Sequence, residues 1–213
     1  MRLVLLVSTL VGLSLPGSQA LCAGPSGVFL NVGPGALVFD EGATVSAAGS
    51  VIPGATVKIH PNETLLTAFG YRWNRVAISF TGGYPPLATV NGAGSLATLG
   101  ELGRIRYGPM VLTAQYHFTQ FGRLQPYVGA GPVFLYIFKN DDGAVRDLKV
   151  RDHVGAAIQF GVEYSLGPRW SAYFDAKKVF LKTNATALLN GTPIAADIRL
   201  NPIVLGGGLS YRF

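Results

Sequence analysis

The sequence has three histidines, the side chains that most often act as acid or base in catalysis, and they lie far apart: His60, His117 and His153. A metal site would need closer spacing or cysteine partners, and the single cysteine is Cys22. A serine-type hydrolase or acyltransferase needs a hydroxyl and a carboxylate beside one histidine. His117 has Thr119 on its own face, but no carboxylate follows before Asp141. The residues therefore favour no metal and no cofactor, and a lipid-modifying enzyme is the weakest functional hypothesis.

Polar side chains interrupt several apolar stretches at positions that would share one face of a β-strand. They are Arg72, Gln115, Gln159, Glu163, Asp175, Lys177 and Arg212. Charges enclosed in a narrow interior must be paired to offset lost hydration, so we interpret the set as a polar plug. Further along, the same faces become apolar and supply candidates for a ligand-binding lumen: Leu66, Val111, Phe134, Tyr136, Val179 and Val204. An apolar cup above a charged floor would accept a small hydrophobic molecule but stop it from dropping straight through.

The stretches that carry these residues alternate with a period of two, as β-strands do. In residues 110–118, and again in 156–164, apolar side chains occupy one face and polar side chains the other. The apolar faces finish in aromatic residues, which predicts a lipid-facing band with an interfacial girdle. The girdle candidates are Phe69, Tyr71, Trp73, Tyr116, Phe118, Tyr127, Tyr164, Trp170, Tyr211 and Phe213.

The connections between these strands alternate in length. Long, polar segments lie at about 39–55, 84–105, 139–152 and 184–197, and short turns lie around 73–75, 120–123 and 167–169. Seven connections join eight strands, and an even number of strands brings both chain termini to the side of the short turns. This asymmetry is typical of short periplasmic turns and longer extracellular loops.

The composition agrees with a membrane barrel. Of the residues, 49% are apolar and only 13% are charged, about half the charged fraction of an ordinary soluble protein. After residue 21, no window approaches the roughly 18 apolar residues that a membrane helix needs. Because lipid leaves only helices and closed sheets as spanning structures, the sequence predicts an all-β, eight-stranded, antiparallel up-and-down transmembrane β-barrel.

The N-terminus predicts export. Arg2 precedes an apolar run and a breaker followed by small residues, which is typical of a signal peptide over residues 1–23. Cleavage after Ala20 or Ala23 would leave a barrel over 24–213; the residues around Cys22 fit a lipidation motif poorly. Export makes nucleic-acid binding an unlikely use of the net charge of +6, whereas basic side chains near strand ends could pair with phosphates of outer-membrane lipids and lipopolysaccharide.

Several segments resemble the OmpW family (outer-membrane protein W): residues 107–118, 125–131, 158–175 and 201–213. The most specific features are Pro-Tyr-Val-Gly-Ala-Gly at 126–131 and the terminal Tyr-Arg-Phe at 211–213. The resemblance implies an eight-stranded barrel in the outer membrane of a Gram-negative bacterium, with an apolar interior that passes small hydrophobic molecules. We also expect the barrel-assembly machinery to recognise the C-terminal strand through Tyr211 and Phe213. The loops depart from the family, for example at 87–103, so the identity of the ligand is not carried over.

The functional hypothesis is a narrow apolar conduit for uptake of small hydrophobic molecules. An eight-stranded barrel has room for side chains or one slim ligand, which excludes a general porin. Pro109, Pro132 and Pro202 fall in predicted strands and weaken the wall, because proline cannot donate to the ladder. One of them could mark a lateral opening into the membrane, although a bulge near a strand end is the simpler explanation for each one. A structural or surface-recognition barrel without transport remains the main alternative.

Overall fold

The computed structural model describes residues 26–40 and 42–213, so the expected signal peptide lies outside the described residues. Eight antiparallel strands form a closed barrel, because each pairs with the next and the last pairs with the first. They are β1 (Gly27–Val38), β5 (Asn62–Trp73), β6 (Val76–Gly83), β8 (Glu101–His117), β9 (Leu124–Asp142), β11 (His153–Ser165), β12 (Trp170–Phe180) and β15 (Ile203–Arg212). The predicted fold class is confirmed.

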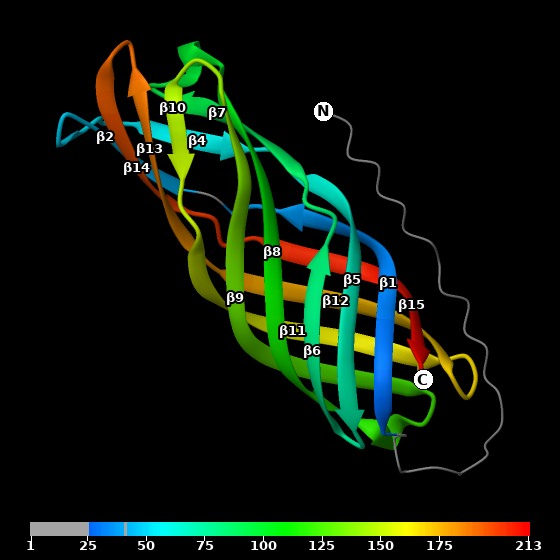
Figure 1. Cartoon of the computed structure of the whole chain (residues 1–213). Coiled ribbons are helices and arrows are strands. Elements are labelled where there is room, and N and C mark those ends of the chain that lie inside the picture. The colour runs from blue at the N-terminus through cyan, green and yellow to red at the C-terminus, as the bar shows by residue number, and fades with distance from the viewer. Residues whose placement is uncertain (1–25, 41) are drawn as a thin grey trace.

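Short turns join the strands at one end of the barrel, where the C-terminus also lies (Figure 1). Two residues connect β5 to β6, and Asn74 in that turn has a φ of 52°. A short 3-10 turn, η2 (Thr119–Phe121), connects β8 to β9 and is followed by Gly122 with a φ of 67°. These left-handed conformations suit Asn and Gly, which explains why the turns can be so tight.

The long connections at the other end are not irregular loops. They form further strands: β2 (Gly42–Ala47), β3 (Ser50–Val51), β4 (Ala55–Ile59), β7 (Leu87–Gly94), β10 (Arg146–Val150), β13 (Lys182–Leu189) and β14 (Thr192–Arg199). Five of them make a separate sheet in the order β10-β13-β14-β2-β3, whereas β4 and β7 extend the barrel sheet beside β8. Figure 1 shows that this region continues the barrel beyond the eight-stranded wall. The sequence predicted the positions of these segments but not their strand structure.

Glycines allow the first and last strands to approach closely where the barrel closes. A Cβ atom on Gly33 would lie 2.0 Å from the carbonyl oxygen of Gly207, and one on Gly208 would lie 2.2 Å from that of Val32. Only glycine fits at such distances. Gly33 of β1 and Gly208 of β15 therefore serve close packing in the wall.

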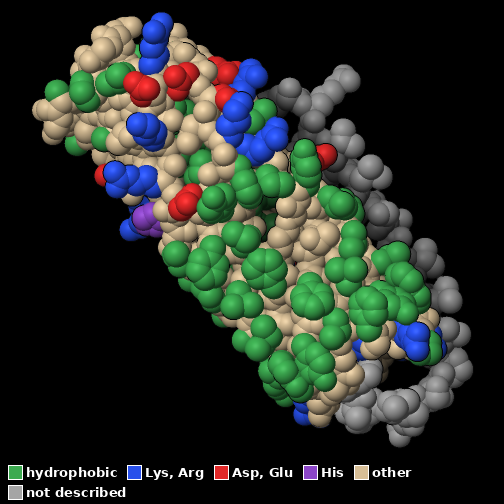
Figure 2. Space-filling view, viewed as in Figure 1, with side chains coloured by type: hydrophobic (Ala, Val, Ile, Leu, Met, Phe, Trp, Pro, Cys, Tyr) green, Lys and Arg blue, Asp and Glu red, His purple; other side chains and the backbone are tan. Residues whose placement is uncertain are grey.

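The outer face of the barrel is apolar, and toward the short turns the inner face differs from it because it carries polar side chains. Hydrophobic side chains cover the barrel wall on the face seen in Figure 2, whereas most of the charged side chains gather over the loop end. The predicted outward positions of β11, including Ile158 and Phe160, are exposed, and Gln159 between them is buried. Among the described residues, no helix is long and apolar enough to cross a membrane.

Candidate functional site

At the turn end of the lumen, one carboxylate lies between two arginines. Glu163 accepts from Arg212 at 2.9 Å and contacts Arg72 at 3.4 Å. Arg72 is only 1% exposed and also donates to the side chain of Gln125 at 2.8 Å and to the backbone oxygen of Asn74 at 2.7 Å. Its guanidinium is therefore held by three acceptors, which compensates for its removal from water.

One level above, Asp175 is the centre of a second polar group. It pairs with Lys177, accepts from Gln159 and accepts from the Tyr127 hydroxyl at 2.8 Å. The Gln159 side-chain oxygen in turn accepts from Thr113 at 2.8 Å and from Gln115 at 3.2 Å. All seven residues predicted for the plug thus point into the barrel, and we call them the polar floor.

The polar floor leaves almost no open space. Its two cavities have a volume of about 10 Å³ each. A volume of this size holds about one water molecule. His117 stacks on the Tyr127 ring with centroids 4.7 Å apart and contacts Gln115, so the ring fills the lumen within this group.

Above the floor, aliphatic side chains from six strands meet across the lumen. Four of the six predicted lumen residues belong to this layer and are buried: Leu66, Val111, Val179 and Val204. They join Leu37 and Val133 in one hydrophobic cluster, and these six residues make up what we call the apolar collar. The order along β12, Asp175, Lys177 and then Val179, places the collar directly above the floor.

An apolar cavity lies above the collar, where the barrel meets the additional strands of the long connections, which we call the loop strands. This upper cavity has a volume of about 80 Å³. Barrel strands contribute Ile105, Tyr107, Leu135 and Ile137, and the loop strands contribute side chains such as Val57, Ile59, Ala88, Val90, Ala185, Ala187 and Ile198. Almost every lining residue is aliphatic. Cavities of this kind stay dry and can bind small apolar molecules.

The remaining two lumen candidates were predicted wrongly. Phe134 and Tyr136 are 41% and 47% exposed on the outer face, and Val133, Leu135 and Ile137 point inward instead. Tyr127 was assigned to the outer girdle, but it is buried and bonded to Asp175. The three errors have one cause. Both faces of β9 are apolar, so the alternation of side chains does not fix which face is inside.

Comparison with known proteins now identifies the family. The model of the OmpW family matches residues 32–213, which is most of the chain. The protein belongs to the OmpW family. It is 33% identical over 177 residues to outer membrane protein AlkL of Ectopseudomonas oleovorans, covering 83% of this chain and 77% of AlkL. It is 30% identical over 181 residues to dibenzothiophene metabolism operon protein PahQ of Pseudomonas aeruginosa, covering 83% and 84%.

Solved structures agree on the architecture of this OmpW-family protein. OprG from Pseudomonas aeruginosa superimposes with a TM-score of 0.84 at 20% identity, over 91% of this chain and 99% of OprG, and supports the fold. AlkL in lipid bilayers gives a TM-score of 0.70 at 29% identity, over 95% and 97% of the two chains. The protein is therefore an outer-membrane β-barrel of a Gram-negative bacterium.

The family assignment also sets the orientation of the site. The short turns and the polar floor lie on the periplasmic side, and the loop strands with the upper cavity lie on the extracellular side. Tyr211 and Phe213 are at the periplasmic end, with ring centroids 4.9 Å apart. Their role in assembly stays a prediction.

Proposed function

We propose that this OmpW-family protein takes up small hydrophobic molecules from outside the cell through its upper cavity. The single observation that carries the proposal is the contrast between an almost wholly aliphatic cavity of about 80 Å³ and the closed polar floor below it. An apolar solute gains free energy by leaving water for such a cavity, whereas ions and sugars would lose hydration without compensation. The relative PahQ is named for dibenzothiophene metabolism, and dibenzothiophene is a small hydrophobic molecule, which supports this substrate class.

A hydrophobic solute in the upper cavity needs an exit other than the floor, and we infer that it leaves sideways into the membrane. β8 pairs with β6 only as far as Val111 and with β7 only from Arg106. Between these limits, one hydrogen bond from the Tyr107 N–H to the Pro86 carbonyl joins β8 to the neighbouring segment. Pro85, Pro86 and Pro109 all border this stretch and have no N–H to donate. Few main-chain hydrogen bonds therefore hold the wall along this stretch.

The other two prolines offer poorer exits. Pro202 precedes β15 and its carbonyl accepts from Val179, which is the behaviour of an ordinary strand end. Pro132 lies opposite Ala156 of β11. On its other side, the pairing of β9 with β8 is interrupted between the Val111–Val133 pair and the Ala114–Ala130 pair. That break faces the packed collar, because Val133 beside it is fully buried. Pro109 is better situated, since its neighbour Tyr107 lines the upper cavity.

The side chain of Tyr107 lies between the upper cavity and this stretch of the wall. Its hydroxyl accepts from the side chain of Asn62 at 3.2 Å, which ties β8 to β5 across the region where β6 has ended. Its ring packs edge-on against Phe39 with centroids 6.2 Å apart. We expect rotation of this ring to connect the cavity with the membrane.

The uptake proposal is tested with whole cells that express the protein, by following entry of a small fluorescent hydrocarbon such as naphthalene. Ala185→Phe fills the upper cavity and should reduce uptake several-fold. Ala156→Phe places the same side chain on the outer face, toward lipid, and should leave uptake unchanged. If neither substitution changes uptake while alterations of the outer loops alone change the phenotype, the barrel is a scaffold for surface recognition.

The exit proposal has a separate test in the same assay. Tyr107→Phe removes the link to Asn62 and keeps the ring, so uptake should rise or stay equal. Tyr107→Trp puts a larger ring in the proposed exit and should slow uptake. Tyr164→Phe, at an exposed tyrosine near the short turns and far from this stretch, is the matched control. Equal uptake by the Trp variant and the wild type would rule out an exit beside Tyr107.

A further inference from the structure

We call the five-stranded sheet β10-β13-β14-β2-β3 the loop sheet. Its outer face carries basic side chains that have no acidic partner. Lys149, Arg151, Lys182 and Arg199 are all exposed, and within the described part of the chain none of them forms an ion pair. The acid on this face, Asp197, is already bound by Asn184. This hydrogen bond from a neutral amide leaves the charge of the Asp197 carboxylate in place, but the four cations outnumber it, so the loop sheet presents an excess of positive charge.

The strand register brings three of these cations together. Lys182 on β13 lies directly opposite Arg199 on β14. Arg151 follows β10, and its N–H donates to the Asn184 carbonyl, which sets it one row further along the same face. Opposite residues have Cβ atoms about 5 Å apart, and successive rows on one face are about 7 Å apart. The long side chains of Arg151, Lys182 and Arg199 can thus converge on one anion.

Like charges directly opposite each other destabilise a sheet, so the Lys182–Arg199 pair calls for an explanation. Cross-strand repulsion at this point disappears when a multivalent anion binds between the two side chains. A phosphate monoester fits this need, because its oxygens accept several hydrogen bonds and guanidinium groups bind phosphate with matched geometry.

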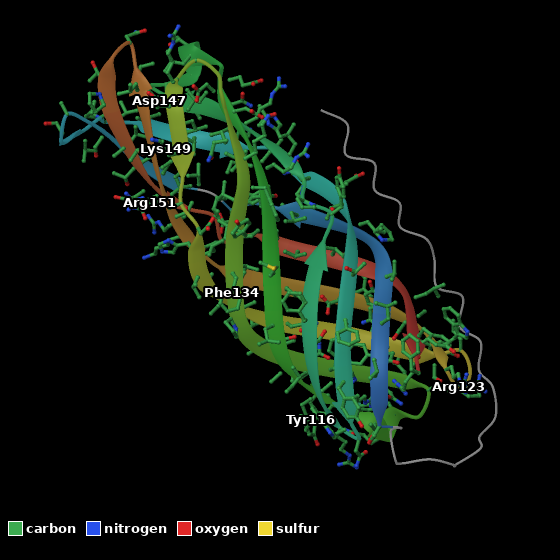
Figure 3. The ribbon with its side chains drawn as sticks, viewed as in Figure 1. Tyr116, Arg123, Phe134, Asp147, Lys149 and Arg151 are labelled. Carbon is green, nitrogen blue, oxygen red and sulfur yellow. The ribbon has the colours of Figure 1, made fainter. Side chains whose placement is uncertain are left out.

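The place of the cluster in the fold indicates where such a phosphate would come from. Phe180 on β12 is two residues before Lys182 and faces outward, and the first outward apolar side chain of β11 is Val154. Figure 3 shows Lys149 and Arg151 beyond Phe134 toward the loop end, and Figure 2 shows basic side chains at the edge of the hydrophobic belt. The cations therefore lie at the level of the lipid headgroups, and the apolar side chains below them lie at the level of the acyl chains.

We propose that Arg151, Lys182 and Arg199 form a binding site for the phosphate of a phosphorylated, acylated glucosamine lipid, the lipid A part of lipopolysaccharide. The cations hold the phosphate, and the acyl chains run down the wall over Phe180 and Val154. An acidic protein would satisfy the charges but would not use the apolar surface directly beneath them. The site is independent of uptake and stands whether or not the barrel conducts hydrophobic molecules.

The test measures binding of lipid A to the purified full-length protein in a zwitterionic detergent. The site variant combines Arg151→Gln, Lys182→Gln and Arg199→Gln. The matched control combines Arg75→Gln, Arg123→Gln and Arg169→Gln, which remove the same charge from the three periplasmic turns. We expect the site variant to bind bisphosphorylated lipid A at least about tenfold more weakly than the wild type, because charge-assisted hydrogen bonds are lost. The control should bind as the wild type does.

Thermal unfolding provides a second readout. Without lipid A, the site variant should be as stable as the wild type or slightly more stable, because the repulsion between opposite cations is gone. Added lipid A should raise the unfolding temperature of the wild type and of the control but not of the site variant.

Two further arms distinguish the sources of the phosphate. Inorganic phosphate at equal concentration should not displace lipid A, and lipid A that lacks both phosphates should bind as weakly to the wild type as to the site variant. Equal losses in both triple variants, or full displacement by inorganic phosphate, would overturn the proposal.

Discussion

The two halves of the barrel interior differ in how firmly their side chains are held. In the periplasmic half, ion pairs and hydrogen bonds connect β5, β8, β9, β11, β12 and β15 through named polar atoms. In the extracellular half, almost only aliphatic contacts surround the upper cavity. Buried polar groups demand partners with defined geometry, whereas aliphatic side chains tolerate rearrangement. We infer that the lower half fixes the barrel and that the upper half can open around a ligand.

The largest expected effect comes from the centre of the rigid half. Glu163→Gln removes the charge that Arg72 and Arg212 share, and it should lower the free energy of unfolding by about 3–5 kcal/mol, because two guanidinium groups stay buried without an anion. Equilibrium unfolding in detergent or lipid measures the loss. Hydrocarbon uptake per folded molecule should not rise, since the collar above stays closed. A stable Glu163→Gln variant would mean that the floor does not fix the barrel.

The apolar collar lies between the two halves, and substitutions there and in the upper cavity compare how tightly the two layers are packed. Leu37→Ala should cost about 2–5 kcal/mol, because Leu37 is almost fully buried in a packed cluster. Val57→Ala, in the wall of the upper cavity, should cost clearly less, because that side chain already borders empty space. Similar losses at both positions would remove the contrast between a packed collar and a yielding cavity.

The outer face supplies a third measurement. Phe160→Arg puts a cation toward lipid near the middle of β11 and should cost about 2–4 kcal/mol. Its neighbour Gln159 points into the polar floor, where an added arginine would meet Asp175 rather than lipid. Unfolding in lipid vesicles compares the two substitutions. A larger cost at Gln159 would indicate that crowding in the floor outweighs exposure to lipid.

The sequence predicted the periplasmic half of the site well because polar residues label the inner face there. Each of Arg72, Gln115, Gln159 and Glu163 interrupts an otherwise apolar stretch, so the inner face could be assigned without a structure. Their individual partners could not be predicted, since pairing depends on the register between strands that are distant in sequence. The link from Tyr127 to Asp175 is an example, because an aromatic residue near a strand end fits an interfacial girdle equally well.

The extracellular half was harder to predict for a related physical reason. The interior there is as apolar as the lipid-facing surface, so alternation loses its contrast along residues 133–138. The sequence predicted an apolar cup but none of the residues that line the upper cavity, because most of the cavity wall comes from segments whose glycines and prolines are typical of loops. A usable signal was present in residues 183–187, where Thr and Ala alternate with Asn and Thr, but it is weak and short.

The corrected register of β9 gives the smallest effect and the most direct test of the upper half. A spin label attached through Phe134→Cys should contact lipid and relax strongly with oxygen, which concentrates in the membrane, whereas a label at Leu135→Cys should report a restricted interior. Both variants carry Cys22→Ser to leave one reactive thiol. Because Phe134 is 41% exposed and Leu135 is buried, Phe134→Cys should change the free energy of unfolding by less than about 1 kcal/mol. Addition of a small hydrocarbon should alter the mobility of the Leu135 label, which lines the upper cavity, and leave the Phe134 label unchanged. If oxygen reaches the Leu135 label more readily than the Phe134 label, the inner and outer faces of β9 are the reverse of those described. If the hydrocarbon changes neither label, the upper cavity is not the binding site.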